Sequence, residues 1–260
     1  MSARPDPEVV RGVTVPYRVR FDECAPDGLV RSSALLRYAQ DVAWVHSERM
    51  GFDRAWYAER GLTWVVRAAE LAILEPLELG QVVELTTGVT GFRRVWARRR
   101  TEGRLADGRL ILWGHTDWVM TDVVRGAPSR VPPEFPAVFE VPPGVFEPGR
   151  VPLPPTPGAA VRHVSRVRPQ DLDPMGHVNN AAYLDYLEEA LAVAGDAARP
   201  AITGTPRQIR LEYLVPAAPG SGLVGEAWPE DLEGGPSWAW RLADDDGQEL
   251  ARARVLLQVS

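Results

Sequence analysis

A carboxylate and an imidazole lie close together in one short segment of the sequence, Asp171-Leu-Asp-Pro-Met-Gly-His-Val-Asn-Asn180. Pro174 and Gly176 cannot continue regular structure, so the pattern predicts a turn. The asparagines that end the segment are typical of a helix cap. Asp173 and His177 should therefore lie in front of a helix N-terminus. There an imidazole can act as a general base, and free backbone amides can stabilise an anion.

Each of these side chains also has a purely structural interpretation. An aspartate in a turn commonly hydrogen-bonds to its own loop, and residue type alone favours this role for Asp173. His177 could be a packed core histidine. Asn179 and Asn180 are better explained as cap and loop fasteners than as catalytic groups. The residue types by themselves leave these alternatives open.

The elements that must position this segment are a helix and an antiparallel sheet. Leu184, Leu187, Leu191 and Ala194 recur on one face of a helix that follows the turn. One helix lying across an antiparallel sheet would bury both apolar faces, so we predict an α+β fold. Strand-like segments follow at residues 208–215, 222–228, 237–242 and 249–259.

The first half of the chain repeats this order. A strand at 13–21, a turn and a helix starting near Ser32 or Ser33 are followed by strands at 63–74, 81–90, 92–100 and 110–122. At a constant offset of 148, the aligned pairs are Arg20 and Arg168, Pro26 and Pro174, Gly28 and Gly176, Val30 and Val178, and Tyr38 and Tyr186. We therefore expect two units, 1–127 and 159–260, joined by a proline-rich linker at 128–158.

The polar residues of the turn occur in only one of the two copies. Asp173 aligns with Ala25 and His177 with Leu29, so the first copy lacks both groups. The two asparagines likewise align with Arg31 and Ser32. Any chemistry should therefore belong to the second unit, and the first should supply structure and part of a binding tunnel.

The composition excludes several classes of protein. The formal net charge of −6 argues against nucleic-acid binding, which depends on neutralising phosphates. The sequence has no apolar run that could span a bilayer and no signal-peptide core at its N-terminus. Its single cysteine, Cys24, excludes an internal disulfide and fits a reducing cytoplasm, where we expect the protein. No spacing indicates a metal site or a phosphate loop, so we expect no metal and no cofactor.

One local cluster departs from the acidic balance. All 29 basic residues are arginines, and six of them surround Trp96 in a strand-like segment. These six are Arg93, Arg94, Arg98, Arg99, Arg100 and Arg104. A solvated strand face is the favoured explanation. The alternative is a docking patch for an acidic or phosphorylated carrier.

The order of a strand, a D-x-D-x-x-G-H-V-N-N-x-x-Y segment opening a long helix, and four antiparallel strands resembles the hotdog fold. The tandem arrangement resembles the acyl-carrier-protein (ACP) thioesterases of plants and bacteria. Three further stretches match features of the first repeat in that family: Leu35-Leu36-x-Tyr38-Ala39-Gln40, Thr63-Trp64-Val65-Val66-Arg67 and Trp118-Val119-Met120. The resemblance covers nearly the whole chain and implies a double hotdog fold.

The resemblance also implies an activity, the hydrolysis of fatty acyl thioesters carried by ACP or coenzyme A. Asp173 and His177 match two catalytic positions of the family and would activate or orient water. The amides of Gly176, Val178, Asn179 and Asn180 would then bind the oxyanion or the substrate. Because tandem fusion already supplies the pairing that single hotdogs obtain by dimerising, we expect a monomer or a homodimer.

Two departures from the family keep a second function open. The plant enzymes have an asparagine midway between the aspartate and the histidine, where this chain has Met175. They also have an acid and a cysteine after the next strand, where this chain has Pro216 and Ala217. A non-catalytic acyl-binding protein is therefore the alternative. A hydratase or dehydratase ranks last, because no histidine here is followed by the spaced glycine and proline of that class.

Overall fold

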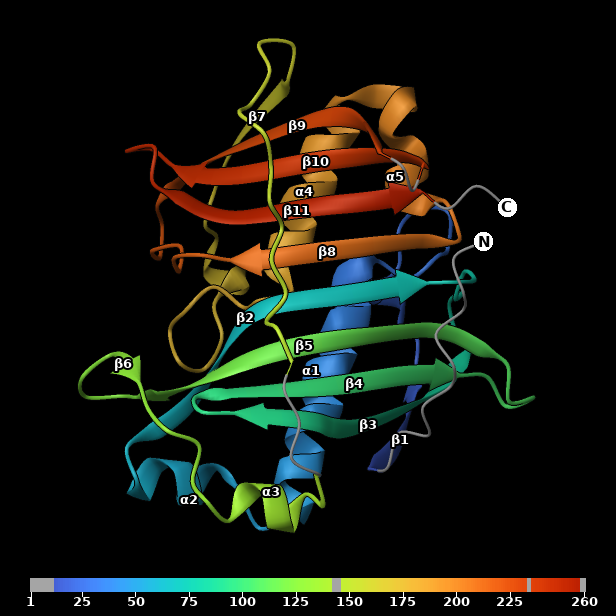
Figure 1. Cartoon of the computed structure of the whole chain (residues 1–260). Helices are drawn as coiled ribbons and strands as arrows, with labels where there is room; N and C mark the ends of the chain where they lie inside the picture. The colour runs from blue at the N-terminus through green and yellow to red at the C-terminus, as the bar shows by residue number, and fades with distance from the viewer. Residues whose placement is uncertain (1–11, 142–145, 233–234, 258–260) are drawn as a thin grey trace.

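A single antiparallel sheet runs through both halves of the chain and carries the two long helices on one face (Figure 1). The computed structural model describes residues 12–141, 146–232 and 235–257. Within them the strand order is β1-β3-β4-β5-β2-β8-β11-β10-β9-β7, with β6 beside β5. The predicted α+β fold of two hotdog units is confirmed. Each unit is an antiparallel sheet curved around one helix.

The first unit begins with β1 and the long helix α1. Ser32 and Ser33 are the first residues of α1 and not its cap, because Arg31 holds the N-cap position without a side-chain cap bond. The elements of this half are β1 (Val13–Arg18), α1 (Ser32–Arg49), α2 (Arg54–Glu59), β2 (Leu62–Ile73), β3 (Val82–Arg93), β4 (Trp96–Arg104), β5 (Leu110–Asp122), β6 (Ala127–Pro128) and α3 (Phe135–Val138).

The second unit repeats the order with a shorter helix. Strand β8 ends two residues before the predicted end, because the amides of Leu214 and Val215 leave the ladder and bond to the carbonyl of Leu250. The elements are β7 (Val161–Arg166), α4 (Ala182–Val193), α5 (Arg199–Thr203), β8 (Arg207–Tyr213), β9 (Gly222–Leu232), β10 (Gly235–Asp244) and β11 (Glu249–Leu257).

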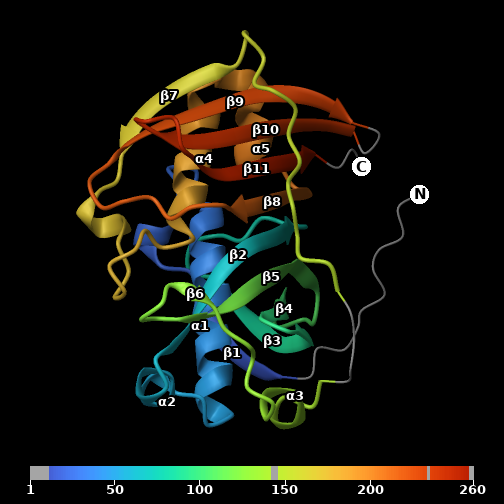
Figure 2. The ribbon, with the colours of Figure 1, turned by 60° about the vertical axis from the view of Figure 1, so that its left-hand side comes forward.

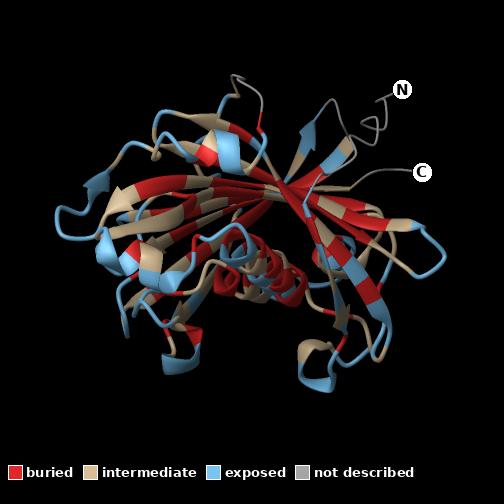
Figure 3. Ribbon diagram, turned by 90° about the horizontal axis from the view of Figure 1, so that it is seen from below, coloured by how far each residue is buried: buried red, intermediate tan, exposed pale blue. Residues whose placement is uncertain are grey.

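The units join where β2 pairs with β8, from Ala68 opposite Glu212 to Ile73 opposite Arg207. The buried residues lie mainly between the sheet and the two helices (Figure 3). Leu187 and Leu191 of α4 are fully buried, and each such side chain contributes about 1.5–3 kcal/mol on burial. Side chains of the first unit pack into this same cluster, so the two units share a core.

The segment after α3 crosses the opposite face of the sheet (Figures 1 and 2). The Gly149 amide donates to the Asp117 carboxylate of the first unit at 2.7 Å. The Val151 amide donates to the Glu212 carboxylate of the second unit at 2.9 Å. The segment is therefore fastened to both halves.

The arginine cluster is neither a solvated face nor a docking patch. Arg99 and Arg100 are only 7% and 4% exposed. Arg99 hydrogen-bonds to Nδ1 of the core histidine His46, and Arg98 forms a bidentate ion pair with Asp117. Five of the six guanidinium groups bond within the chain, at residues 93, 98, 99, 100 and 104. Both sequence interpretations of this cluster are wrong. Arg98 and Arg99 bond to partners from distant parts of the chain. Arg100 and Arg104 pair with the buried Glu102 of the same strand.

Candidate active site

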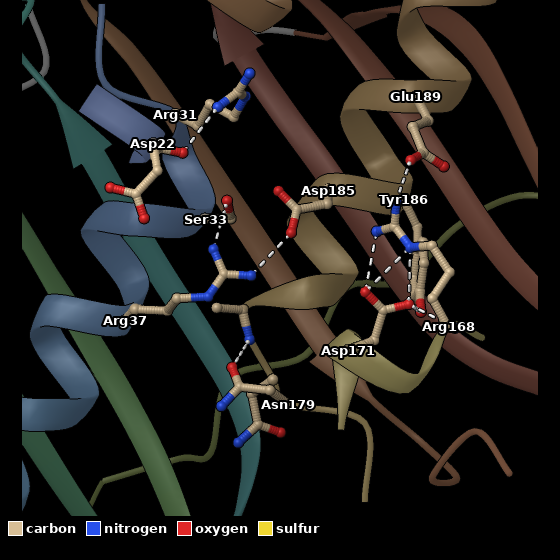
Figure 4. Close-up of polar contacts among 12 residues, drawn as sticks. Asp22, Arg31, Ser33, Arg37, Arg168, Asp171, Asn179, Asp185, Tyr186 and Glu189 are labelled. Atoms are coloured by element: carbon tan, nitrogen blue, oxygen red, sulfur yellow. Dashed lines mark hydrogen bonds and ion pairs between the residues drawn. The ribbon is translucent and has the colours of Figure 1, made fainter. Parts of the chain in front are cut away.

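An ion pair between the exposed side chain of Arg168 and the buried Asp171 holds the base of the loop that carries Asp173 and His177. The Asp171 carboxylate is 4% exposed and accepts hydrogen bonds from the Arg168 amide at 2.8 Å and from the Tyr186 hydroxyl at 2.7 Å (Figure 4). The Arg168 guanidinium pairs with the same carboxylate at 3.0 Å. Burial alone would raise the pKa of Asp171, but the bonds from Arg168 and Tyr186 outweigh it and lower that pKa. We name these three residues the second-unit anchor.

The first unit has the same arrangement, the first-unit anchor of Arg20, Glu23 and Tyr38. The Arg20 amide donates to Glu23 at 2.8 Å, and the Tyr38 hydroxyl donates to the same carboxylate. The repeat explains why the arginine and the tyrosine align between the two copies. Sequence reasoning missed the acid of each anchor, although Glu23 and Asp171 also align at the offset of 148.

The loop closes on itself as a tight hairpin. Leu172 and Val178 form a β-bridge, and the Asp173 amide donates to the His177 carbonyl at 2.8 Å. Gly176 adopts a φ of 75°, a left-handed conformation that favours glycine. Proline and glycine in the sequence therefore predicted this turn for the right physical reason.

The Asp173 carboxylate caps this loop. Its Oδ1 accepts hydrogen bonds from the amides of Met175 at 2.8 Å and His177 at 3.3 Å. The His177 side chain is exposed, and among the described residues no hydrogen bond joins it to Asp173. The loop thus brings the carboxylate and the imidazole into one small hairpin and leaves the imidazole facing solvent.

The four predicted anion-binding amides differ in their freedom. Those of Gly176 and Asn179 already donate to the carbonyls of Asp173 and Asp171. No hydrogen bond of the described residues uses the amides of Val178 and Asn180. The Asn179 side chain accepts from the Ala181 amide at 2.9 Å, the cap-like role expected of it. Two free donors therefore lie beside the start of α4.

The first unit contacts the loop and its helix. The Thr63 hydroxyl of β2 donates to the Met175 sulfur at 3.5 Å. Arg37 of α1 pairs with Asp185 of α4 at 2.9 Å (Figure 4). The Ala217 amide, where the family resemblance would place the cysteine that follows the acid, donates to the buried Tyr183 hydroxyl at 3.0 Å. Ala217 and Tyr183 both lie in the buried cluster that the two units share.

Neither a metal site nor a membrane-spanning helix is found among the described residues. In the part of the chain that the structure describes, no three His, Cys, Asp or Glu side chains gather as a metal site. No described helix is long and apolar enough to span a membrane.

Comparisons with solved structures show the same architecture along the whole chain. A Lactobacillus plantarum protein described as an oleoyl thioesterase superposes with a TM-score of 0.82 at 20% identity, covering 97% of this chain and 99% of that one. An acyl-ACP thioesterase from Bacteroides thetaiotaomicron reaches 0.75 at 16% identity, with 94% and 96% covered. The 12:0-ACP thioesterase from Umbellularia californica reaches 0.75 at 20% identity, with 94% and 92% covered. These likenesses show the double hotdog fold.

Family models match both units. No curated protein sequence matches the chain. Residues 13–139 match the acyl-ACP thioesterase N-terminal domain, and residues 167–204, which include the candidate loop, match the thioesterase-like superfamily. The two units therefore match thioesterase models, the first that of the acyl-ACP thioesterase N-terminal domain, and the chain is a thioester hydrolase.

Proposed function

We propose that the chain hydrolyses fatty acyl thioesters of ACP or coenzyme A in the cytoplasm, at the loop of the second unit. The observation that carries this proposal is a difference between the two units. Among the described residues, only those of the second unit place a carboxylate and an imidazole on a hairpin beside free amides at a helix N-terminus. We further propose that the tandem pairing lets one chain work as a monomer.

The chemistry asks for a base and an anion site. The thiol that leaves has a pKa of about 8.5, so the departing thiolate needs little acid assistance. In the proposed reaction the His177 imidazole takes a proton from water as the water oxygen bonds to the acyl carbon. The amides of Val178 and Asn180 hold the resulting oxyanion. The intermediate then collapses, breaks the carbon–sulfur bond and releases the fatty acid, and the imidazolium returns its proton to the departing thiolate.

Asp173 has a supporting role in this scheme. Its carboxylate accepts the His177 amide and so fixes the hairpin that carries the imidazole.

The test is the release of free thiol from octanoyl-ACP and octanoyl-coenzyme A. His177→Ala should lower kcat about 100-fold or more, the usual contribution of a general base. His163→Ala removes a histidine that pairs with Glu189 outside the loop and should keep wild-type turnover. Equal rates for His177→Ala and wild type would refute the site.

A second candidate function is acyl binding without turnover. It is favoured by the contact of Met175 with Thr63 and by the apolar surroundings of Ala217, where the family resemblance implies polar groups. An acyl thioester that co-purifies and is retained, with no thiol released by the wild-type chain, would support it over hydrolysis.

A further inference from the structure

A small cavity lies where the turn of the first unit faces the second unit. It has a volume of about 40 Å³, and a water needs about 10–15 Å³ on this measure. There is room for a carbonyl group and the carbons beside it. Its apolar wall includes Leu29, Leu35, Ile73 and Ile202, and its polar wall includes Glu188 and Arg207.

The polar wall contains a hydrogen-bond donor without an acceptor. Arg207 is 5% exposed, and its Nη1 and Nη2 donate to the Gly204 carbonyl at 2.7 Å and the Ser32 hydroxyl at 3.0 Å. Its Nε has no partner among the described residues. A buried donor without an acceptor destabilises the fold by about 1–3 kcal/mol. We therefore expect this nitrogen to donate to an oxygen atom of a bound molecule.

The charges favour a neutral oxygen over an anion. Glu188 supplies a carboxylate that offsets the Arg207 guanidinium, and both lie at the cavity. Asp27 and Arg31 also line it and add one charge of each sign. Burial raises the pKa of Glu188 and lowers the pKa of Arg207, so each charge depends on the other. A ligand carboxylate would add an uncompensated negative charge beside Glu188. A carbonyl oxygen accepts the Nε hydrogen without that penalty.

The cavity occupies the counterpart of the candidate active site. In the first unit the Leu74 amide donates to the Ile111 carbonyl. In the second unit the Leu214 amide donates to the Leu250 carbonyl in the same way. These equivalent bonds align β2 with β8 at an offset of 140 residues. The turn at the cavity aligns with the catalytic loop but has Ala25 and Leu29 in place of Asp173 and His177. This position therefore has a cavity and a helix N-terminus but lacks the carboxylate and the imidazole of the second-unit loop.

We propose that this cavity binds the carbonyl end of a second acyl thioester and does not hydrolyse it. Arg207 donates to the acyl oxygen, and the apolar wall contacts the first carbons of the chain. The ligand class rests on the proposed function, whereas binding at the cavity does not depend on turnover.

The test uses a non-hydrolysable probe, an octanoyl amide of N-acetyl-ethylenediamine, titrated by calorimetry. Ala25→Phe fills the cavity from the turn, and Arg207→Leu removes the donor. Each should weaken one class of binding site at least ten-fold, the usual loss for a hydrogen bond to a charged group. Arg210→Leu, on the same strand but paired with Glu70, is the matched control and should bind as wild type. Because Ala25 lies on a surface turn, its variant serves if Arg207→Leu does not fold.

Binding curves of Ala25→Phe equal to wild type would overturn the proposal, and so would equal binding of an analogue with a methylene in place of the carbonyl. Thiol release reports separately on the second-unit loop. Hydrolysis of octanoyl-ACP without any binding that depends on the cavity would refute only this inference. One that binds the probe at the cavity without hydrolysis sinks only the proposed function.

Discussion

Replacing Tyr186 with phenylalanine removes one hydroxyl from the second-unit anchor and leaves the ring in place. The lost group donates to the Asp171 carboxylate at 2.7 Å. Asp171 is buried, and its backbone carbonyl accepts the Asn179 amide at the end of the candidate loop. The substitution should therefore destabilise the fold and also loosen the loop that carries His177.

The size of the stability loss follows from the bond. A hydrogen bond to a charged group contributes about 1.5–3 kcal/mol, and a loss near 2 kcal/mol lowers the Tm of a chain this long by roughly 4–8 °C. The pKa of Asp171 is lowered in the folded state, so its stabilisation is present above the unfolded value and lost as the pH falls through the folded one. The gap between wild type and variant should be full at pH 7 and narrow progressively as the pH falls below about 4.

Tyr38→Phe is the matched control, because Tyr38 donates to Glu23 in the first-unit anchor. Thermal unfolding and octanoyl-ACP hydrolysis are measured for both variants. We expect similar losses of Tm, with a fall in kcat and an altered pH profile of kcat for Tyr186→Phe alone. Equal kcat in the two variants would refute the idea that the second-unit anchor positions the loop.

Two further predictions concern titratable groups buried in the first unit. Burial, together with Arg99, lowers the pKa of His46 to about 4, so only the unfolded chain takes up that proton as the pH falls from about 6.5 to 4. Wild type should lose roughly 3 kcal/mol over this window, and His46→Gln should lose less in denaturant titrations. Arg98→Leu leaves Asp117 buried without its ion pair and should cost about 3–5 kcal/mol. Arg93→Leu breaks a pair with an exposed carboxylate and should cost less than about 1 kcal/mol in the same assay.

The internal repeat made most of the fold predictable. Alternating apolar residues located the strands, and the stripe of Leu184, Leu187 and Leu191 located the second helix, because burial of one face imposes these periods. The pairing of β2 with β8 could not be predicted. Alternation gives the buried face of a strand but not its neighbour in the sheet.

The loop of the candidate site could be predicted from the sequence, but the directions of its side chains could not. Residue types and spacing placed Asp173 and His177 on one hairpin, as the structure finds. The Asp173 carboxylate turns toward backbone amides that the loop leaves without a carbonyl partner. Sequence spacing does not show which amides those are. Asp173 accordingly bonds to its own loop, the interpretation that residue type alone had favoured.

The arginine cluster shows why local composition misled the sequence interpretation. A guanidinium is planar, carries five donors and keeps its charge when buried, so one arginine can satisfy several distant partners at once. Arg98 bonds both to Asp117 and to the Glu147 carbonyl of the crossing segment. Strand β4 therefore ties the helix face to the opposite face of the sheet, with Arg99 reaching His46 of α1. A lysine offers a single nitrogen and could not replace Arg98 in its bidentate pair.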